Sequence, residues 1–434
     1  MNSPKYPGFD TLSLHAGSQP DPETGARATP IYLSTSFVFQ NSDEAASLFN
    51  MEKSGHIYSR ISNPTNSVLE ERIAALENGI SGIAVSSGQA ALHLAISTIS
   101  GSGSHILASR SLYGGSHNLL HYTLKRFGIE TTFIDPRNLN EWKENIRPNT
   151  KLLFAETISN PGIEIIDIEK VSEIAHKNHL PLILDSTLTT PYLLKPFNYG
   201  ADIIFHSATK FLCGHGTVVG GILVDGGIFD WQDAYDKTLN FKELCEPYDG
   251  FHNMNFSEES SVAPFSLRAR REGLRDFGAV MSPYNAFMIL QGIETLSIRM
   301  KKHVENTRSI ITFLNSSPIV KSVSYPELPE HPDYELSKRI LPNGCGSVFS
   351  FELKGDRLAG KKFVESLKIF SHLANVGDAK SLVIHPASTT HFRVPKNELK
   401  NSGITEGTIR LSIGLEDTED LIDDLKKSLK KSQK

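Results

Sequence analysis

Short apolar runs alternate with segments of helical spacing over the middle of the chain. From about Glu70 to Ala208 the order is VLEERIAALENG, HILAS, ETTFID, KLLFAE, VSEIAHKNH, PLILD and ADIIFHS. Short apolar runs separated by helices are typical of βαβ units, whose parallel strands are covered on both faces. The pattern therefore predicts an α/β domain built on a mainly parallel sheet.

The pattern changes in the last third of the chain. A helical stretch of mixed periodicity runs from about Pro283 to Leu314, followed by the apolar runs VKSVSYP, GSVFSFEL and TIRLSIGLE and by the helical segment KKFVESLKIF. These segments predict a second, smaller C-terminal α/β domain, with its boundary inside the long helix. We place the large domain at residues 66–290 and the small domain at 291–434.

Composition narrows the class of protein. The 434 residues carry a formal net charge of −5, which offers no overall field to attract nucleic acid or an anionic membrane. Cys213, Cys245 and Cys345 are scattered without C-x-x-C pairing, and the histidines lack metal-ligand spacing. No apolar run is long enough to span a bilayer, and the first residues have no leader pattern. We expect a cytoplasmic protein with small-molecule substrates and no metal site.

Polar residues follow several of the predicted strands. In parallel sheets, ligands bind beyond the carboxyl ends of the strands, so these side chains are expected to meet at one rim. They are Thr157, Asn160, Asp185, Ser207, Thr209 and Lys210.

This combination matches what pyridoxal phosphate requires. The cofactor aldehyde needs an amine such as Lys210, and its ring nitrogen needs a carboxylate such as Asp185. SSGQAALHLAIS opens a helix whose free N–H groups suit a phosphate, and Tyr113 in LYGGSHN offers a ring for stacking. Each feature alone has an ordinary structural interpretation. Their presence together, each at the end of a segment, favours the cofactor.

The sequence resembles the transsulfuration, or Cys/Met metabolism, family of pyridoxal-phosphate enzymes over nearly its whole length. The matching motifs are YSRISNPTNSVLEERIAALE, SSGQAAL, LYGG, ETISNPGIEI, LDSTLTTPYLLKP, HSATKFLCGHG and TIRLSIGLE. The resemblance implies fold type I, the aspartate aminotransferase-like α/β fold, with a large domain on a mainly parallel sheet and a smaller C-terminal α/β domain.

The resemblance also assigns roles to individual residues. It implies that Lys210 is the Schiff-base lysine and general base, that Asp185 is the partner of the ring nitrogen, and that Tyr113 is the stacking phenol. The remaining cofactor-binding residues that it implies are Ser87, Gly88, Gln89, Thr187, Ser207 and Thr209. The residues implied to bind the substrate carboxylate are Asn160, Ser381 and Arg410.

The segment around Tyr58 and Arg60 has a further implied role. In the family, the YSR segment reaches the phosphate of the adjacent subunit, which implies that residues 1–65 form an arm contacting a neighbour. A guanidinium suits a phosphate because it donates two parallel hydrogen bonds. We expect a homotetramer built as a dimer of dimers, and both Tyr113 and Tyr58 are candidate catalytic residues.

Local sequence segments indicate which branch of the family this chain resembles. The C-terminal half and the aromatic-rich excursion at residues 230–256 look like the longer O-acetylhomoserine sulfhydrylases. This implies conversion of O-acetyl-L-homoserine and sulfide, or a small thiol, to L-homocysteine, or methionine, and acetate. The alternatives are O-succinylhomoserine sulfhydrylase, cystathionine γ-synthase and methionine γ-lyase, or a cofactor-binding regulator without turnover. The excursion is either a surface feature or an active-site cover.

Overall fold

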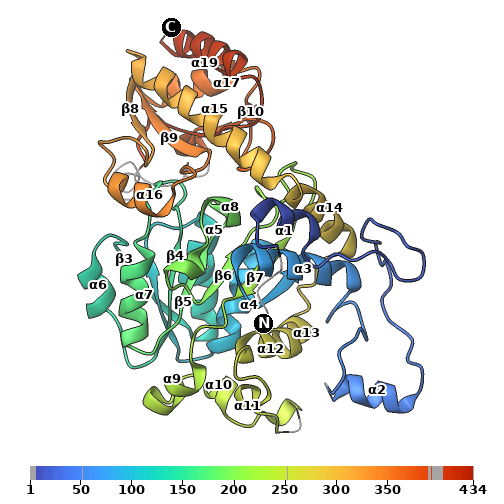
Figure 1. The fold of residues 1–434 in the computed structure, drawn as a ribbon. Coiled ribbons are helices and arrows are strands. Elements are labelled where there is room, and N and C mark those ends of the chain that lie inside the picture. Colours follow the sequence, from blue (N-terminus) through green and yellow to red (C-terminus); the bar gives the residue numbers. More distant parts are fainter. Residues whose placement is uncertain (1–5, 51, 252, 390–391, 393–403, 434) are drawn as a thin grey trace.

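The computed structural model describes residues 6–50, 52–251, 253–389, 392 and 404–433. These residues form two α/β parts, one above the other in Figure 1, each built around its own sheet. Among them, no helix is both long and apolar enough to cross a membrane.

The larger sheet has seven strands within the described residues, in the order β1-β7-β6-β5-β4-β2-β3. All are parallel except β7, which is antiparallel to both β1 and β6. Their bounds are β1 Ser81–Val85, β2 His105–Ser109, β3 Glu130–Ile134, β4 Thr150–Glu156, β5 Leu182–Asp185, β6 Ile203–His206 and β7 Gly221–Asp225. The predicted mainly parallel sheet is confirmed.

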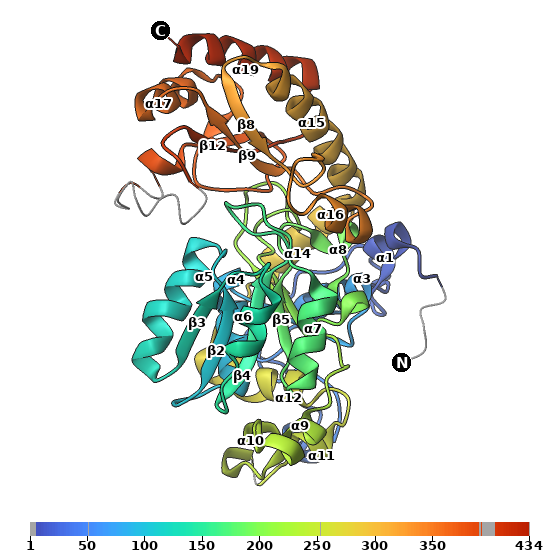
Figure 2. The ribbon, with the colours of Figure 1, turned by 90° about the vertical axis from the view of Figure 1, so that its left-hand side faces the viewer.

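Helices cover both faces of this sheet (Figures 1 and 2). On one face lie α3 Pro64–Glu77, α6 Leu139–Glu144 and α7 Ile168–Lys177, and on the other lie α4 Gly88–Ile99 and α12 Pro264–Arg268. Helix α7 shows how the sequence produces this layer. Its N-cap Asp167 accepts from the Lys170 N–H, and Ile168, Val171 and Ala175 recur at helical spacing on its buried side.

Several shorter helices connect these elements. They are α1 Phe9–His15, α2 Ser42–Phe49, α5 Gly114–Asn118, α8 Thr190–Leu193, α9 Trp231–Thr238, α10 Lys242–Cys245, α11 Phe256–Glu259 and α13 Arg275–Phe277. The segment that carries α2 extends away from the rest of the molecule in Figure 1.

The smaller sheet has five strands within the described residues, in the order β10-β11-β12-β9-β8, and only β10 and β11 pair in parallel. Their bounds are β8 Val320–Ser324, β9 Val348–Leu353, β10 Ser371–His372, β11 Leu382–Ile384 and β12 Thr408–Ser412. The accompanying helices are α15 Leu296–Ser316, α16 Tyr334–Ile340, α17 Arg357–Ser366 and α19 Thr418–Ser432. The predicted C-terminal α/β part is present.

The prediction of one long helix over Pro283–Leu314 is wrong, because two helices occupy this stretch, α14 Pro283–Ile293 and α15 Leu296–Ser316. Gly292 passes so close to the chain after β6 that an added Cβ would lie 2.3 Å from the Cys213 carbonyl oxygen. The Arg299 side chain donates to the Gly292 carbonyl at 2.7 Å and to the Phe211 carbonyl at 2.8 Å. This tight packing accompanies the break, whereas the domain limits at 65/66 and 290/291 stay predictions.

The excursion at residues 230–256 lies at the end of the larger part that is opposite the smaller sheet (Figure 1). Its aromatic side chains pack together there, with the Trp231 ring 5.1 Å from that of Phe241 and 5.7 Å from that of Phe265. None of its described residues lines the pocket at the carboxyl ends of the strands. Within one chain, the excursion is a surface feature and not a cover.

Candidate active site

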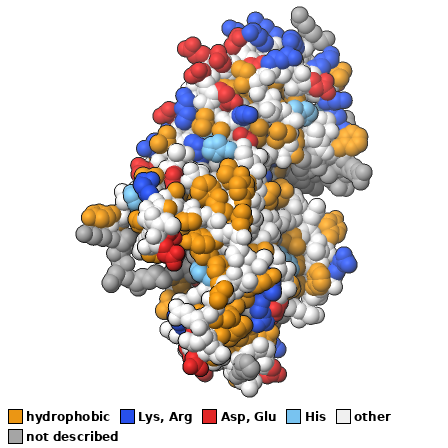
Figure 3. Space-filling view, turned by 90° about the vertical axis from the view of Figure 1, so that its right-hand side faces the viewer, with side chains coloured by type: hydrophobic (Ala, Val, Ile, Leu, Met, Phe, Trp, Pro, Cys, Tyr) orange, Lys and Arg blue, Asp and Glu red, His pale blue; other side chains and the backbone are white. Residues whose placement is uncertain are grey.

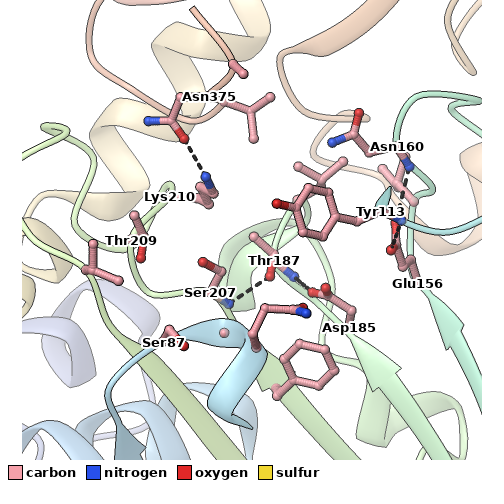
Figure 4. A pocket seen from close by; sticks show the side chains of 18 of the residues that line it. Ser87, Tyr113, Glu156, Asn160, Asp185, Thr187, Ser207, Thr209, Lys210 and Asn375 are labelled. Atoms are coloured by element: carbon pink, nitrogen blue, oxygen red, sulfur yellow. Dashed lines mark hydrogen bonds between the residues drawn. The ribbon is translucent and has the colours of Figure 1, made fainter. Parts of the chain in front are cut away.

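A cavity of about 250 Å³ lies between the carboxyl ends of the larger sheet and the smaller part (Figure 4). Its polar lining residues are Ser87, Gly88, Gln89, Tyr113, Glu156, Asn160, Asp185, Thr187, Ser207, Thr209, Lys210, Asn375 and Arg410. The apolar lining residues are Ile158, Leu188, Phe205, Val219, Ala374 and Val376. The structure therefore brings most of the predicted site residues together, and it leaves Tyr58, Arg60 and Ser381 outside.

The start of α4 forms one end of the cavity. Ser87 caps the helix by accepting from the Ala90 N–H at 3.1 Å, which orients the first turn toward the pocket. A Cβ at Gly88 would lie 2.7 Å from the Ser207 Cβ, so only glycine lets the helix end come this close to the residue after β6. The N–H groups in the first turn of α4 lie beside the hydroxyls of Ser207 and Thr209, and together these groups can bind an anion.

Asp185 ends β5 and lies in the wall of the cavity. Its Oδ1 accepts from the Thr187 N–H at 2.9 Å, and the Thr187 hydroxyl accepts from the Ser207 N–H at 2.8 Å. Burial raises the pKa of the Asp185 carboxyl, and the hydrogen bonds from Thr187 lower it. A carboxylate in such a place favours a protonated nitrogen next to it.

Lys210 lies four residues beyond the end of β6 and faces Asn375 from the smaller part (Figure 4). Its Nζ donates to the Asn375 Oδ1. Burial lowers the pKa of the Lys210 amine, the charge of Arg410 lowers it further, and the charge of Asp185 raises it. A lysine with a lowered pKa is more often unprotonated near neutral pH, so it can act as a nucleophile or base.

Arg410 on β12 joins the two parts of the molecule across the cavity. Its Nη1 donates to the Asn160 Oδ1 at 3.0 Å, and its Nη2 donates to the Asn375 carbonyl at 3.1 Å. Burial lowers the pKa of the guanidinium to about 10, which still leaves it charged at neutral pH. A guanidinium held in this way beside an amide suits a carboxylate ligand.

Tyr113 projects its ring into the cavity from the loop after β2 (Figure 4). A Cβ at Gly115 would lie 2.4 Å from the ring carbon Cε1, so glycine at this position gives the ring its place. The side chain is 51% exposed, which leaves one ring face free to stack on a flat ligand.

Tyr58 and Arg60 lie apart from the cavity of their own chain. The Arg60 guanidinium sits 5.4 Å from the centre of the Tyr58 ring, and its Nη1 donates to the Arg275 carbonyl. The Tyr58 side chain is 41% exposed. Their expected contact with a neighbouring subunit stays a prediction.

Ser381, which was predicted to contact the substrate, does not line the cavity. Its buried hydroxyl donates to the Glu416 Oε2 at 2.8 Å and accepts from the Gly414 N–H at 2.8 Å. Ser381 therefore anchors the chain after β12. The loop between β10 and β11 reaches the cavity instead through Asn375 and its neighbours.

Sequence reasoning missed two polar lining residues, Glu156 and Asn375. Glu156 is the last residue of β4, just as Asp185 is the last residue of β5, so the same strand-end signal was available for it. Asn375 meets Lys210 from a position 165 residues further along the chain, and no local pattern marks it.

A sequence profile described as "Cys/Met metabolism PLP-dependent enzyme" matches residues 10–430. The chain belongs to this family. O-acetyl-L-homoserine sulfhydrylase of Leptospira meyeri is 44% identical to it over 430 residues, covering 97% of this chain and 96% of that protein. Homocysteine synthase of Schizosaccharomyces pombe is 44% identical over 422 residues, covering 97% of this chain and 98% of that protein.

A solved structure gives the same result for the fold. The putative O-acetylhomoserine (thiol)-lyase of Campylobacter jejuni, solved with a pyridoxyl-lysine phosphate adduct, superposes with a TM-score of 0.93 at 41% sequence identity. The match covers 98% of this chain and 100% of that one. The predicted family, fold and cofactor class are confirmed.

The cavity of this Cys/Met metabolism enzyme fits pyridoxal phosphate. At the N-terminus of α4, Gly88 carries no Cβ that would meet Ser207, and this leaves room for the phosphate. Asp185 would hold the ring nitrogen, Tyr113 would stack on the ring, and Lys210 would bind the aldehyde carbon. Within the described residues, no three His, Cys, Asp or Glu side chains gather in a way that could hold a metal ion.

Proposed function

We propose that this protein converts O-acetyl-L-homoserine and sulfide to L-homocysteine and acetate. The observation that carries the proposal is near-full-length similarity, at 42–44% identity, to proteins named O-acetyl-L-homoserine sulfhydrylase or homocysteine synthase. A cavity lined by the Lys210 amine, the Asp185 carboxylate and the Arg410 guanidinium supports it. Use of a small thiol, with methionine as the product, stays a prediction.

Arg410 and Asn160 bind the α-carboxylate of the amino acid in this proposal. They are already hydrogen-bonded at 3.0 Å, and Arg410 has donors left for a ligand. This contact fixes the substrate at one end, so that its α-carbon faces Lys210. Pre-arranged groups of this kind raise the rate by positioning the reacting atoms.

Lys210 moves the protons. When bound, pyridoxal phosphate supplies an electron sink that stabilises negative charge on the carbons next to the amino group of the substrate. Lys210, with its pKa lowered mainly by burial, removes the α-proton and returns a proton at the end of the reaction. Asp185 holds a proton on the ring nitrogen and so keeps that sink effective.

Replacement at the γ-carbon needs a second set of contacts. Acetate departs with the electron pair of the γ-carbon–oxygen bond, and the sulfur of sulfide supplies the pair for the new γ-carbon–sulfur bond. In this proposal the hydroxyl of Tyr113, a residue that lines the cavity, donates or accepts a proton near this carbon, and Tyr58 from a neighbouring subunit is a second candidate.

The experiment that tests the function measures products. Purified holoenzyme is mixed with O-acetyl-L-homoserine and sulfide, and homocysteine and acetate are quantified together. Equal amounts of both are expected. Homocysteine from O-succinyl-L-homoserine alone, cystathionine when cysteine is the donor, or 2-oxobutyrate as the main product would each move the protein to another activity of the family. No product from any of these substrates would favour a regulator.

We further infer a homotetramer built as a dimer of dimers. Figure 3 shows hydrophobic side chains gathered on one face of the molecule. Several large apolar side chains of the first 65 residues are exposed, among them Val38 at 99% and Leu33 at 75%. Such exposure is typical of a surface covered by a second subunit. Light scattering measures the mass of the assembly in solution and so tests whether it contains four chains.

Mixing two inactive variants tests the contribution of a neighbour. If Tyr58 and Arg60 act across the interface, refolding Arg60→Ala together with Lys210→Ala restores part of the activity, because some cavities then contain both native residues. Absence of any recovery would contradict that role.

A cytoplasmic location is supported by Cys213, Cys245 and Cys345, which are free and buried, and it stays a prediction.

A further inference from the structure

Glu156 is a buried carboxylate in the cavity to which no role has been given so far. It ends β4 and is only 6% exposed. Its Oε1 accepts from the Tyr113 N–H at 2.5 Å, and its Oε2 accepts from the Asn160 N–H at 3.2 Å. One side chain thus binds the backbone of two different loops, as Figure 4 shows.

We propose that Glu156 is a positioning residue that holds the loop of Tyr113 and the loop of Asn160 in one fixed relation. The first loop follows β2 and the second follows β4, and these strands are neighbours in the sheet. Because both loops leave the same edge of the sheet, a single carboxylate between them can bridge the two. The inference deepens the proposed function, on which it rests for the roles of Tyr113 and Asn160.

The surroundings of Glu156 oppose a charged side chain, so the presence of an acid there needs a specific reason. Glu156 pairs in register with Asp185 on the adjacent parallel strand, so the two carboxyls project from the same face of the sheet. Burial raises the pKa of Glu156 well above its usual range, and the neighbouring Asp185 raises it further. Two like charges side by side are unfavourable, and a neutral side chain would fill the space at lower free-energy cost.

Two N–H donors on separate loops explain why the acid is there. A carboxylate presents two acceptors, one to each N–H, whereas glutamine presents one acceptor and one NH₂ group that faces an N–H. Only the acid satisfies both backbone groups. The hydrogen bonds from the Tyr113 and Asn160 N–H groups lower the pKa of Glu156 and so offset part of the effect of burial on it.

The effect of Glu156 reaches the substrate through Asn160. The Asn160 Oδ1 accepts from the Arg410 Nη1 at 3.0 Å, so the backbone bond from Asn160 to Glu156 also helps to orient the guanidinium. Loosening the Asn160 loop weakens carboxylate binding. Loosening the Tyr113 loop frees the stacking ring.

The test compares Glu156→Gln holoenzyme with wild type and with a matched control, Glu327→Gln. Glu327 also accepts from a backbone N–H, that of Cys345 at 3.1 Å; it forms an ion pair with Arg308 and lies outside the cavity. The first readout is hydrogen–deuterium exchange of peptides covering residues 111–118 and 157–165. We expect faster exchange in at least one of these segments in Glu156→Gln and unchanged exchange in both segments of the control.

The second readout is kinetic. We expect Glu156→Gln to raise KM for O-acetyl-L-homoserine ~10-fold, with KM for sulfide within about twofold of wild type, because misplacing the carboxylate-binding groups affects one substrate. Glu327→Gln keeps both KM values. If Glu156→Gln does not fold, Glu156→Asp replaces it, since the shorter acid keeps the charge and fails to reach both loops.

Native exchange in both segments together with a native KM for O-acetyl-L-homoserine would overturn the inference. The exchange measurement requires no turnover. A wild-type protein that makes no homocysteine would therefore disprove the proposed function, while the exchange result would still decide whether Glu156 fixes the two loops.

Discussion

Two aspartates at opposite ends of the strands of the larger sheet have different surroundings. Asp202, just before β6 at the amino ends of the strands, accepts from the Leu182 N–H at 2.7 Å, and its Oδ2 lies 2.9 Å from the His176 Nε2. Asp185, at the carboxyl end of β5, faces the cavity with Glu156 beside it on β4. Burial raises the pKa of both aspartates.

The difference lies in where each charge finds its partner. Asp202 is paired within the chain, as expected of a buried acid that stabilises the fold. Asp185 is paired with a backbone N–H on one side and open to a ligand on the other. An acid at the carboxyl end of a parallel strand is thus available for chemistry, whereas the same residue type at the other end is used for folding.

The largest expected effect is at the cavity itself. Lys210→Ala removes the amine that moves the protons, and turnover is expected to fall ~10⁴-fold. The melting temperature of the variant should stay close to that of wild type. Homocysteine formation measured over long times checks the rate. Residual activity within tenfold of wild type would contradict the role of Lys210.

Asp185→Asn should act on turnover and leave the fold intact. Loss of the carboxylate weakens protonation of the ring nitrogen, and kcat is expected to fall ~10²-fold or more. The comparison is direct because Asp202→Asn makes the same chemical change at the other end of the sheet. A similar drop of kcat in both variants would remove the distinction between the two ends.

Arg410→Lys tests the carboxylate-binding group. Lysine keeps the charge and loses the forked pair of donors, so KM for O-acetyl-L-homoserine should rise ~30-fold, or about 2 kcal/mol. Steady-state kinetics with sulfide held saturating measures this change. An unchanged KM would show that Arg410 does not contact the substrate.

Asp202→Asn should lower stability without changing KM. The asparagine keeps an acceptor for the Leu182 N–H and loses the charge next to His176, so we expect about 1 kcal/mol of destabilisation. Urea unfolding followed by fluorescence measures the shift of the midpoint. A stable variant with altered kinetics would contradict a structural role for Asp202.

The smallest expected effect is a pH dependence at the same pair. The hydrogen bond with Asp202 raises the pKa of His176, so the folded protein binds this proton more tightly than the unfolded chain. The resulting contribution of His176 to the free energy of unfolding is complete below pH about 6.5, and it is lost as the pH rises through the pKa of His176 in the folded protein. Because His176 is half exposed, we expect this contribution to the free energy of unfolding to be about 0.5 kcal/mol.

The variant His176→Gln isolates this term, since glutamine donates to Asp202 at every pH. Wild type should lose stability relative to His176→Gln between pH 6 and pH 8.5, as measured by urea midpoints. Parallel midpoints over this range would show that His176 does not carry the effect.

Residues fixed by local pattern could be predicted from the sequence. Asp185 and Lys210 follow apolar runs that had to become covered strands, and Ser87 precedes a helix start, so their place at one rim followed from the rule for parallel sheets. Glu156 obeyed the same rule, and its position at the end of β4 was visible in KLLFAE. The strands and helices around these residues were predicted for the same reason.

Contacts between distant segments could not be predicted in this way. Asn375 reaches Lys210 and Ser381 does not reach the cavity because the loop between β10 and β11 lies over the larger sheet in one particular orientation. The break between α14 and α15 lies next to Gly292, which meets the chain after β6. Each of these features is decided by how two surfaces fit together.

The sequence by itself determined the fold class and the residues at the strand ends, because hydrophobic periodicity is set by residues that are close together in the chain. The residue types at those ends, together with the family motifs, determined the cofactor. Only the tertiary structure decided that Glu156 bridges two loops, that Arg410 meets Asn160, and that the excursion at 230–256 lies away from the cavity. These contacts join residues far apart in the chain, and side-chain packing across the two sheets selects them.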